Sequence, residues 1–171
     1  MTITEYDYKY CLLCSGNLRK TGPSLLTCEK CGYRVFLNTR PAAGVILRYK
    51  DTFSLCKRAI EPKKGLWDTI GGFVDYSENI EEALRREVRE EAGIELENFR
   101  YIGSRNHDYI YQDVLIRPLG MIFESVLEKM PTIVAQDDID EVRFFNSEEF
   151  PLDELAFPQF RDLFATYISE I

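Results

Sequence analysis

The sequence predicts an α/β fold preceded by a small cysteine-rich module, and three observations support this prediction. A strongly patterned helix at residues 80–92 lies between segments typical of strands, residues 157–171 repeat apolar side chains at helical spacing, and four cysteines form two close pairs near the N-terminus. With 171 residues, 45% of them hydrophobic, the chain can bury one good core and carry a small appendage. We therefore expect a module of residues 1–38 followed by one α/β domain of residues 39–171.

The composition is that of a protein that does not enter membranes. No apolar run approaches the roughly 20 residues that span a bilayer, and the N-terminal MTITEYDYKY has no basic region followed by an apolar core. We expect a cytoplasmic protein without membrane contact.

The four paired cysteines are arranged as metal ligands. Cys11-x2-Cys14 and Cys28-x2-Cys31 are two tight knuckles separated by 13 residues, and each knuckle can aim two thiolates at one point. Two such knuckles complete a closed tetrahedral site, so we expect a structural Zn²⁺ in a zinc ribbon. A redox pair or an iron site would use the same ligands. Cys56 lies in an apolar strand segment and is expected to be an ordinary buried side chain.

The charge of the module bears on its partners. Residues 1–40 contain six Lys or Arg and three acids, a balance of +3, which leaves −11 for the remainder of a chain whose net charge is −8. Four thiolates on Zn²⁺ would reduce the ribbon to about +1, which is too little for a strong electrostatic attraction to nucleic acid. A nucleic-acid partner is therefore not expected.

Strand signals begin the second domain after the sequence N-T-R-P at 38–41. Two apolar segments around a Lys50-Asp51 turn are typical of paired strands, and Trp67 to Ile70 should form another. Gly71 and Gly72 then allow the backbone to approach a ligand closely.

The second half of this domain is expected to hold three more strands and the last helix. The strands are predicted within NFRYIGSRNHDYIYQ, PLGMIFESVLEK and AQDDIDEVRFFNSEEF, with His107, the single histidine, at the surface. The terminal helix has its apolar face at Phe160, Leu163, Phe164, Tyr167 and Ile168.

The helix at 80–92 has clear start and stop signals. Asn79 can act as its N-cap and Glu82, three residues on, can close a capping box. Gly93 can supply the left-handed residue that ends it.

Three glutamates of this helix are expected to bind a cation. Glu87, Glu90 and Glu91 stand at offsets of three and four, which places their carboxylates on one stripe beside an apolar stripe. Like charges at such offsets each cost a helix roughly 0.2–0.5 kcal/mol, so a compensating cation is expected. Carboxylate ligands without a nearby histidine favour Mg²⁺ or Mn²⁺. The alternative is that the three glutamates form an ordinary solvated acidic face without a metal ion.

The full pattern carries a family resemblance. It reads Gly72-x5-Glu78-x7-Arg86-Glu87-Val88-x-Glu90-Glu91-x-Gly93-Ile94, which resembles the Nudix box at every defining position. The sequence is thereby identified as a member of the Nudix hydrolase family. The resemblance implies an α/β/α sandwich with a mixed sheet, and Mg²⁺- or Mn²⁺-dependent hydrolysis of a nucleoside diphosphate linked to another moiety.

The resemblance also implies roles for the residues of the box. Glu87 and Glu91 would be the principal metal ligands, and Glu90 a further ligand or one bound through water. Arg86 would orient Glu87, and Glu78 would support the loop.

Two positions outside the box complete the implied metal site. The carbonyl of Gly71 would join the metal, as would an acid at the start of the closing strand. Glu141 is the candidate for that acid, although Asp137, Asp138 and Asp140 compete for the role.

A second resemblance is to the zinc-ribbon NADH pyrophosphatase branch of the family. That branch carries a Gln/Trp/Pro/Phe-rich array after the box, where this chain has GSRNHDYIYQDV. The departure leaves open which derivative is cleaved. Tyr109 and Tyr111 in this segment are the candidates for stacking on a base.

The expected function is hydrolysis of the pyrophosphate bond in a small nucleotide of the ADP-ribose or NADH type. Two alternatives stay open: a non-catalytic module that senses a nucleotide, and a hydrolase of capped RNA. All four glutamates of the box are present, which favours an enzyme over a sensor. The oligomeric state is open, with the ribbon as the candidate surface for a homodimer.

Overall fold

A computed structural model describes residues 3–4 and 7–171, so part of the N-terminal segment MTITEYDYKY lies outside the described residues. The chain forms two compact units. The first contains residues 1–40 and 108–117, and the second contains residues 41–107 and 118–171. The segment 108–117, which the sequence placed with the second domain, thus groups with the first unit.

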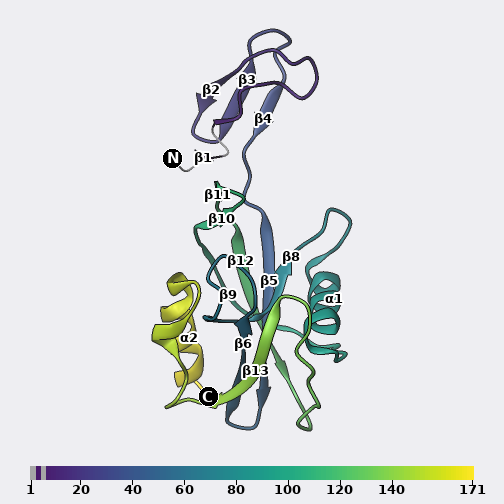
Figure 1. Ribbon diagram of the computed structural model, residues 1–171, viewed down its shortest axis with the longest axis vertical. Coiled ribbons are helices and arrows are strands. Elements are labelled where there is room, and N and C mark those ends of the chain that lie inside the picture. Colours follow the sequence, from purple (N-terminus) through teal and green to yellow (C-terminus); the bar gives the residue numbers. More distant parts are fainter. Residues whose placement is uncertain (1–2, 5–6) are drawn as a thin grey trace. The chain divides into compact units, whose positions relative to one another are not determined.

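A mixed β-sheet forms the centre of the second unit (Figure 1). Its strands run in the order β13-β6-β5-β12-β9, with β7 paired to β6 and β8 paired to β5. The pair β5 and β12 is parallel, and the other pairs are antiparallel. The strands are β5 (Pro41–Tyr49), β6 (Thr52–Arg58), β7 (Trp67–Asp68), β8 (Ile70–Phe73), β9 (Arg100–Asn106), β12 (Leu119–Val126) and β13 (Ile139–Asn146).

Two helices cover opposite faces of this sheet (Figure 1): α1 (Ile80–Ala92) and α2 (Arg161–Ser169). Alternate residues of β5, such as Val45 and Leu47, pack with Leu84 and Val88 of α1 in one buried cluster. The other face is covered by α2 and by the short 3₁₀ turns η2 (Leu152–Glu154) and η3 (Pro158–Phe160). The expected α/β/α sandwich is confirmed.

Aromatic rings fill the layer between the sheet and α2. Phe53 of β6 meets Phe150 and Tyr167 edge to face, with ring centroids 6.3 and 5.6 Å apart, and Phe150 meets Phe164 at 6.0 Å. Such pairs add roughly 0.5–1.5 kcal/mol each beyond the burial of their area. The apolar face predicted for the terminal helix is therefore the face of α2 that packs against the sheet.

A buried acid ties three strands to α2. Glu124 on β12, 3% exposed, accepts hydrogen bonds from Nε of Arg48 on β5 at 2.6 Å and from Nε of Arg100 on β9 at 2.7 Å. The hydroxyl of Tyr167 on α2 donates to the same carboxylate at 2.6 Å. These bonds lower the pKa of Glu124 to about 2, although burial by itself would raise it.

His107 is not at the surface, so that expectation was wrong. Its side chain is 8% exposed and packs against the rings of Phe157 and Phe160, with centroids 4.4 and 5.5 Å away. Cys56 and Trp67 are buried, as predicted for Cys56 from its apolar strand.

The first unit contains two small sheets. One has the antiparallel order β2-β3-β4, formed by β2 (Leu18–Gly22), β3 (Leu25–Cys28) and β4 (Arg34–Phe36). In the other, β11 (Val114–Ile116) pairs antiparallel with β10 (Tyr109–Tyr111) and parallel with β1 (Ile3–Thr4). Gln112 and Asp113 both have positive φ between β10 and β11, as a two-residue hairpin turn requires.

In the described part of the chain, no helix is long and apolar enough to cross a membrane.

Candidate metal centres

The local signals of α1 are realised as the sequence predicts. The Asn79 side chain accepts a hydrogen bond from the Glu82 N–H at 2.9 Å, and the Glu82 carboxylate accepts one from the Asn79 N–H at 2.9 Å. Gly93 ends the helix with φ of 67°. The caps fix where α1 begins and ends, and the packing of Leu84 and Val88 against β5 fixes which way its acidic residues face.

Arg86 is the hub of the acidic stripe. Its Nε and Nη2 donate to the two oxygens of Glu78 at 2.7 and 2.9 Å, and Nη2 also donates to the Phe73 carbonyl at 3.1 Å. Its Nη1 donates to Glu87 at 2.7 Å and to Glu90 at 3.1 Å. One guanidinium therefore fixes three carboxylates, and its hydrogen bonds lower the pKa of Glu78 to about 2.

Glu91 is the buried member of the stripe, and Glu87 is partly buried. Burial raises the pKa of Glu91 to about 8, with a further rise from the charge of Glu87, although the Gly71 N–H donates to it at 2.9 Å. Burial also raises the pKa of Glu87, against the hydrogen bond from Arg86. Buried carboxylates with raised pKa are groups that a nearby cation would return to the charged form.

The glycines before the helix make room for these acids. A Cβ added to Gly72 would lie 2.4 Å from Oε1 of Glu87, so any side chain there would displace the carboxylate. At Gly71 the added Cβ would lie 2.1 Å from the Ala43 carbonyl oxygen, and φ is 145°. The two glycines thus lie close to α1 and to β5, and the approach to a ligand that the sequence predicts stays a prediction.

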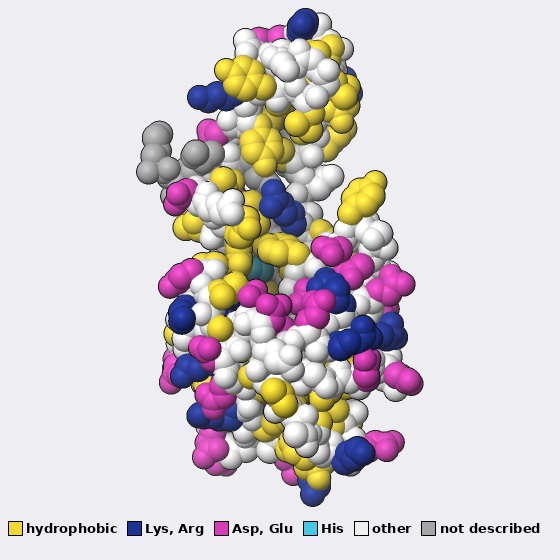
Figure 2. All heavy atoms as spheres, turned by 45° about the vertical axis from the view of Figure 1, so that its right-hand side comes forward, with side chains coloured by type: hydrophobic (Ala, Val, Ile, Leu, Met, Phe, Trp, Pro, Cys, Tyr) yellow, Lys and Arg dark blue, Asp and Glu magenta, His cyan; other side chains and the backbone are white. Residues whose placement is uncertain are grey.

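The chemistry of these glutamates suits a hard divalent cation, and their role as its ligands stays a prediction. Glu87, Glu90 and Glu91 each keep one oxygen that accepts no hydrogen bond from any described residue: Oε2, Oε1 and Oε1, respectively. Carboxylate oxygens on one helix face, two of them partly withdrawn from water, are the ligands that Mg²⁺ or Mn²⁺ prefers. Figure 2 shows acidic side chains gathered on this side of the second unit, with basic ones among them.

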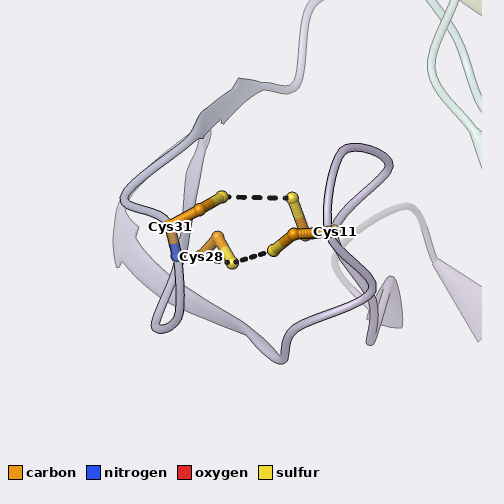
Figure 3. A group of neighbouring side chains, drawn as sticks. Cys11, Cys28 and Cys31 are labelled. Atoms are coloured by element: carbon orange, nitrogen blue, oxygen red, sulfur yellow. Dashed lines mark hydrogen bonds between the residues drawn. The ribbon is translucent and has the colours of Figure 1, made fainter.

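The four cysteines meet in the first unit (Figure 3). Their sulfurs lie within 4.8 Å of one another, and two of the separations are 3.7 Å (Cys11 to Cys31) and 3.5 Å (Cys14 to Cys28). A tetrahedral Zn²⁺ with bonds of about 2.3 Å has edges of about 3.8 Å between sulfurs. The N–H of Cys31 donates to Sγ of Cys28, which lowers the pKa of that thiol. The set fits a structural zinc ion.

A model of the NUDIX domain matches residues 38–166 of this chain. The chain belongs to the Nudix family.

Individual relatives agree with this assignment. The NAD-capped RNA hydrolase NudC of Haemophilus influenzae is 36% identical over 101 residues, which are 57% of this chain and 38% of that protein. The NudC of Salmonella heidelberg is 33% identical over 148 residues, 85% of this chain and 54% of that protein. The chain thus spans 38% to 54% of the length of these two relatives.

The fold also has a near counterpart among crystal structures. A NUDIX hydrolase from Nitrosomonas europaea superposes with a TM-score of 0.72 at 26% sequence identity, over 95% of this chain and 92% of that one.

Outside the Nudix box, the acids that are candidates for the last position in the metal site have different surroundings. Glu141 accepts two hydrogen bonds from the Arg143 guanidinium, at 2.9 and 2.5 Å. Asp138 is the competitor whose charge contributes to the raised pKa of Glu91. Its own pKa is raised by burial and by Asp137. The role predicted for Glu141 stays a prediction, and Asp138 stays one of the alternatives.

Asp68 is a neighbour of the Nudix box that the sequence reasoning missed. It is paired with Arg58 at 3.0 Å, and its charge also contributes to the raised pKa of Glu91. Burial raises the pKa of Asp68 itself, against the ion pair with Arg58. The available signal was an acid between the buried Trp67 and Ile70 in a strand that leads into the box.

Tyr109 and Tyr111 lie on β10 in the first unit, whereas the Nudix box lies in the second. Tyr111 is 53% exposed. Their contact with a base stays a prediction.

Proposed function

We propose that this protein hydrolyses the pyrophosphate bond of a nucleoside diphosphate derivative of the ADP-ribose or NADH type. The observation that carries this proposal is the Arg86 hub, which holds Glu78, Glu87 and Glu90 beside the buried Glu91. A sensor has no need of so many fixed carboxylates with free oxygens.

The reaction consumes one water molecule. Its oxygen bonds to one phosphorus, the bond from that phosphorus to the bridging oxygen breaks, and the products are a nucleoside monophosphate and a second phosphate monoester. Bound Mg²⁺ or Mn²⁺ would neutralise the phosphate oxygens and make water more nucleophilic.

The chain's own residues prepare this site. Glu87, Glu90 and Glu91 would bind the cations, and Arg86 keeps Glu87 and Glu90 in place through Nη1. Gly71 positions Glu91 through its N–H. No Lys or Arg needs to clamp the diphosphate, because the cations cover its charge.

A small substrate suits the charge of the chain. Residues 41–171 carry a net −11, which repels a long polyanion beyond the metal site, whereas the charge of a small diphosphate is covered by the cations. The zinc thiolates also suit a reducing compartment, so we place the protein in the cytoplasm.

Hydrolysis of capped RNA is the second candidate. It is favoured by one finding, the name NAD-capped RNA hydrolase that the related NudC proteins carry. Both candidates use the same diphosphate chemistry, and they differ in whether an RNA chain is attached to the nucleotide.

The test is a substrate panel in ¹⁸O-labelled water with Mg²⁺ or Mn²⁺: ADP-ribose, NADH, NAD⁺, sugar nucleotides, nucleoside triphosphates and NAD-capped RNA. We expect two phosphate monoesters from ADP-ribose or NADH, with the label on one of them. The matched control is Glu87→Gln, which keeps the shape of the side chain and removes its charge.

Three other outcomes would contradict the proposal. Release of pyrophosphate from triphosphates would refute the substrate type. Cleavage of capped RNA alone would select the second candidate. Tight nucleotide binding without any cleavage would select the sensor.

A further inference from the structure

The strand register of the ribbon sheet places two arginines on one face. Arg19 of β2 pairs with Thr27 of β3, and Thr27 pairs with Arg34 of β4, so these three residues form one row across the sheet. Directly paired residues project from the same face of a sheet. The next residues on this face are Leu25 and its partner Phe36. We call this surface the outer ribbon face: Arg19, Thr21, Leu25, Thr27, Arg34 and Phe36.

The opposite face of the same sheet is the packed one. Leu26 and Cys28, which alternate with Leu25 and Thr27 along β3, are each 2% exposed. Side chains alternate between faces along a strand, so the outer ribbon face is the more open one. Four of its residues are exposed and two are half-buried, Leu25 and Thr27. Phe36 is accordingly 63% exposed.

The chemistry of this face is basic, hydroxylic and aromatic. Arg19 and Arg34 stand two strand spacings apart, about 10 Å, with the Thr27 hydroxyl between them. Thr21 and Thr27 share a hydrogen bond of 2.7 Å between their hydroxyls. The charge of Arg19 is partly offset by Glu29, whose Oε1 lies 3.4 Å from Nε of Arg19. The Arg34 side chain forms no hydrogen bond or ion pair with a described residue.

We propose that the outer ribbon face binds single-stranded nucleic acid, with Arg19 and Arg34 on successive backbone phosphates and Phe36 stacked on a base. A face that combines arginines with an exposed aromatic ring can contact both the backbone phosphates and the unstacked bases of a single strand. A duplex does not offer its base faces, so Phe36 has no partner there. The inference goes beyond the hydrolysis proposed above and does not rest on it.

A second copy of the chain fits this face less well. In a two-fold dimer each face meets itself, so Arg19 and Arg34 would approach the same two arginines of the other copy. The phosphates of a nucleic acid supply the opposite charge instead.

The test is fluorescence anisotropy of the full chain with labelled 15-nucleotide probes, oligouridylate and oligothymidylate, without added divalent cations. Arg34→Gln and Phe36→Ser remove one charge and one ring from the outer ribbon face. The matched control is Lys20→Gln, because Lys20 neighbours Arg19 on β2 but pairs with the buried Leu26, on the opposite face. Zinc content and the far-ultraviolet circular dichroism spectrum report whether each variant is folded.

We expect Phe36→Ser to weaken binding about tenfold and Lys20→Gln to change it by less than about twofold. The double variant Arg19→Gln/Arg34→Gln should reduce the slope of log K against log salt concentration by about 1.4, which is about 0.7 for each lost phosphate contact. Binding of either probe supports the proposal, and the tighter probe identifies the preferred sugar.

Four results would overturn the proposal. These are absence of binding to both probes at 50 mM salt, equal binding of a 15-base-pair duplex, an equal effect of Lys20→Gln and Arg34→Gln, and a change of oligomeric state in Phe36→Ser during sedimentation. The last result would assign the face to a second copy of the chain.

Discussion

Acid should destabilise the second unit through Glu124. The hydrogen bonds from Arg100, Tyr167 and Arg48 lower the pKa of this carboxylate from 4.5 to about 2. A group whose pKa is lower in the folded state contributes stability that is fully present above its unfolded pKa. That contribution is lost as the pH falls from about 4.5 through about 2.

The size of the effect can be worked out from the shift. A difference of about 2.5 pH units at about 1.36 kcal/mol each gives about 3 kcal/mol. Glu124 is buried, but the Arg100 side chain is 61% exposed, so solvent and salt screen that part of the interaction. We therefore expect a loss of at most about 3 kcal/mol between pH 6 and pH 2.

The assay is urea unfolding followed by the fluorescence of Trp67, the single tryptophan, which is buried in the second unit. Glu124→Gln cannot titrate in this range, so the difference between its pH dependence and that of the wild type isolates this one carboxylate. Tyr167→Phe, which removes one of the hydrogen bonds, should reduce the pH sensitivity without abolishing it. The same pH dependence in the wild type and Glu124→Gln would refute the reasoning.

Three further predictions concern the two metal centres. Glu87→Gln should lower turnover by at least about 100-fold at saturating Mg²⁺ while the unfolding curve stays cooperative, and near-normal turnover would show that Glu87 is not a ligand. Cys28→Ser should abolish zinc binding, because structural sites contribute on the order of 10–16 kcal/mol in small peptides; elemental analysis would find one zinc per chain in the wild type and none in the variant. Gly72→Ala should mainly lower turnover, since its Cβ would displace Glu87, whereas Gly71→Ala should mainly destabilise the fold, by about 1–3 kcal/mol or more. Turnover and the free energy of unfolding are measured for both variants. The contrast would be contradicted if the two variants changed both quantities to the same extent.

Features with a local cause could be predicted from the sequence. The bounds of α1, its capping box and its left-handed Gly93 depend on residues within four positions of one another. The same is true of the two cysteine knuckles, whose short spacing dictates the turn. Spacing along one helix also sufficed to place Glu87, Glu90 and Glu91 on one stripe, because helix geometry is fixed.

Electrostatic partners from distant segments could not be predicted. Glu124 meets Arg48, Arg100 and Tyr167 only because three strands and a helix pack together, and the sequence shows no pattern that links them. In the same way Asp138 and Asp68 act on Glu91 from other strands and loops.

The ribbon gives the clearest case of a property that only the tertiary structure decided. Its net charge, close to +1 with zinc bound, argued against nucleic acid, because a sum over residues has no direction. The antiparallel register of β2, β3 and β4 puts Arg19 and Arg34 on one face and Lys20 on the other. A binding surface depends on where charges point, and the pairing of strands decides that.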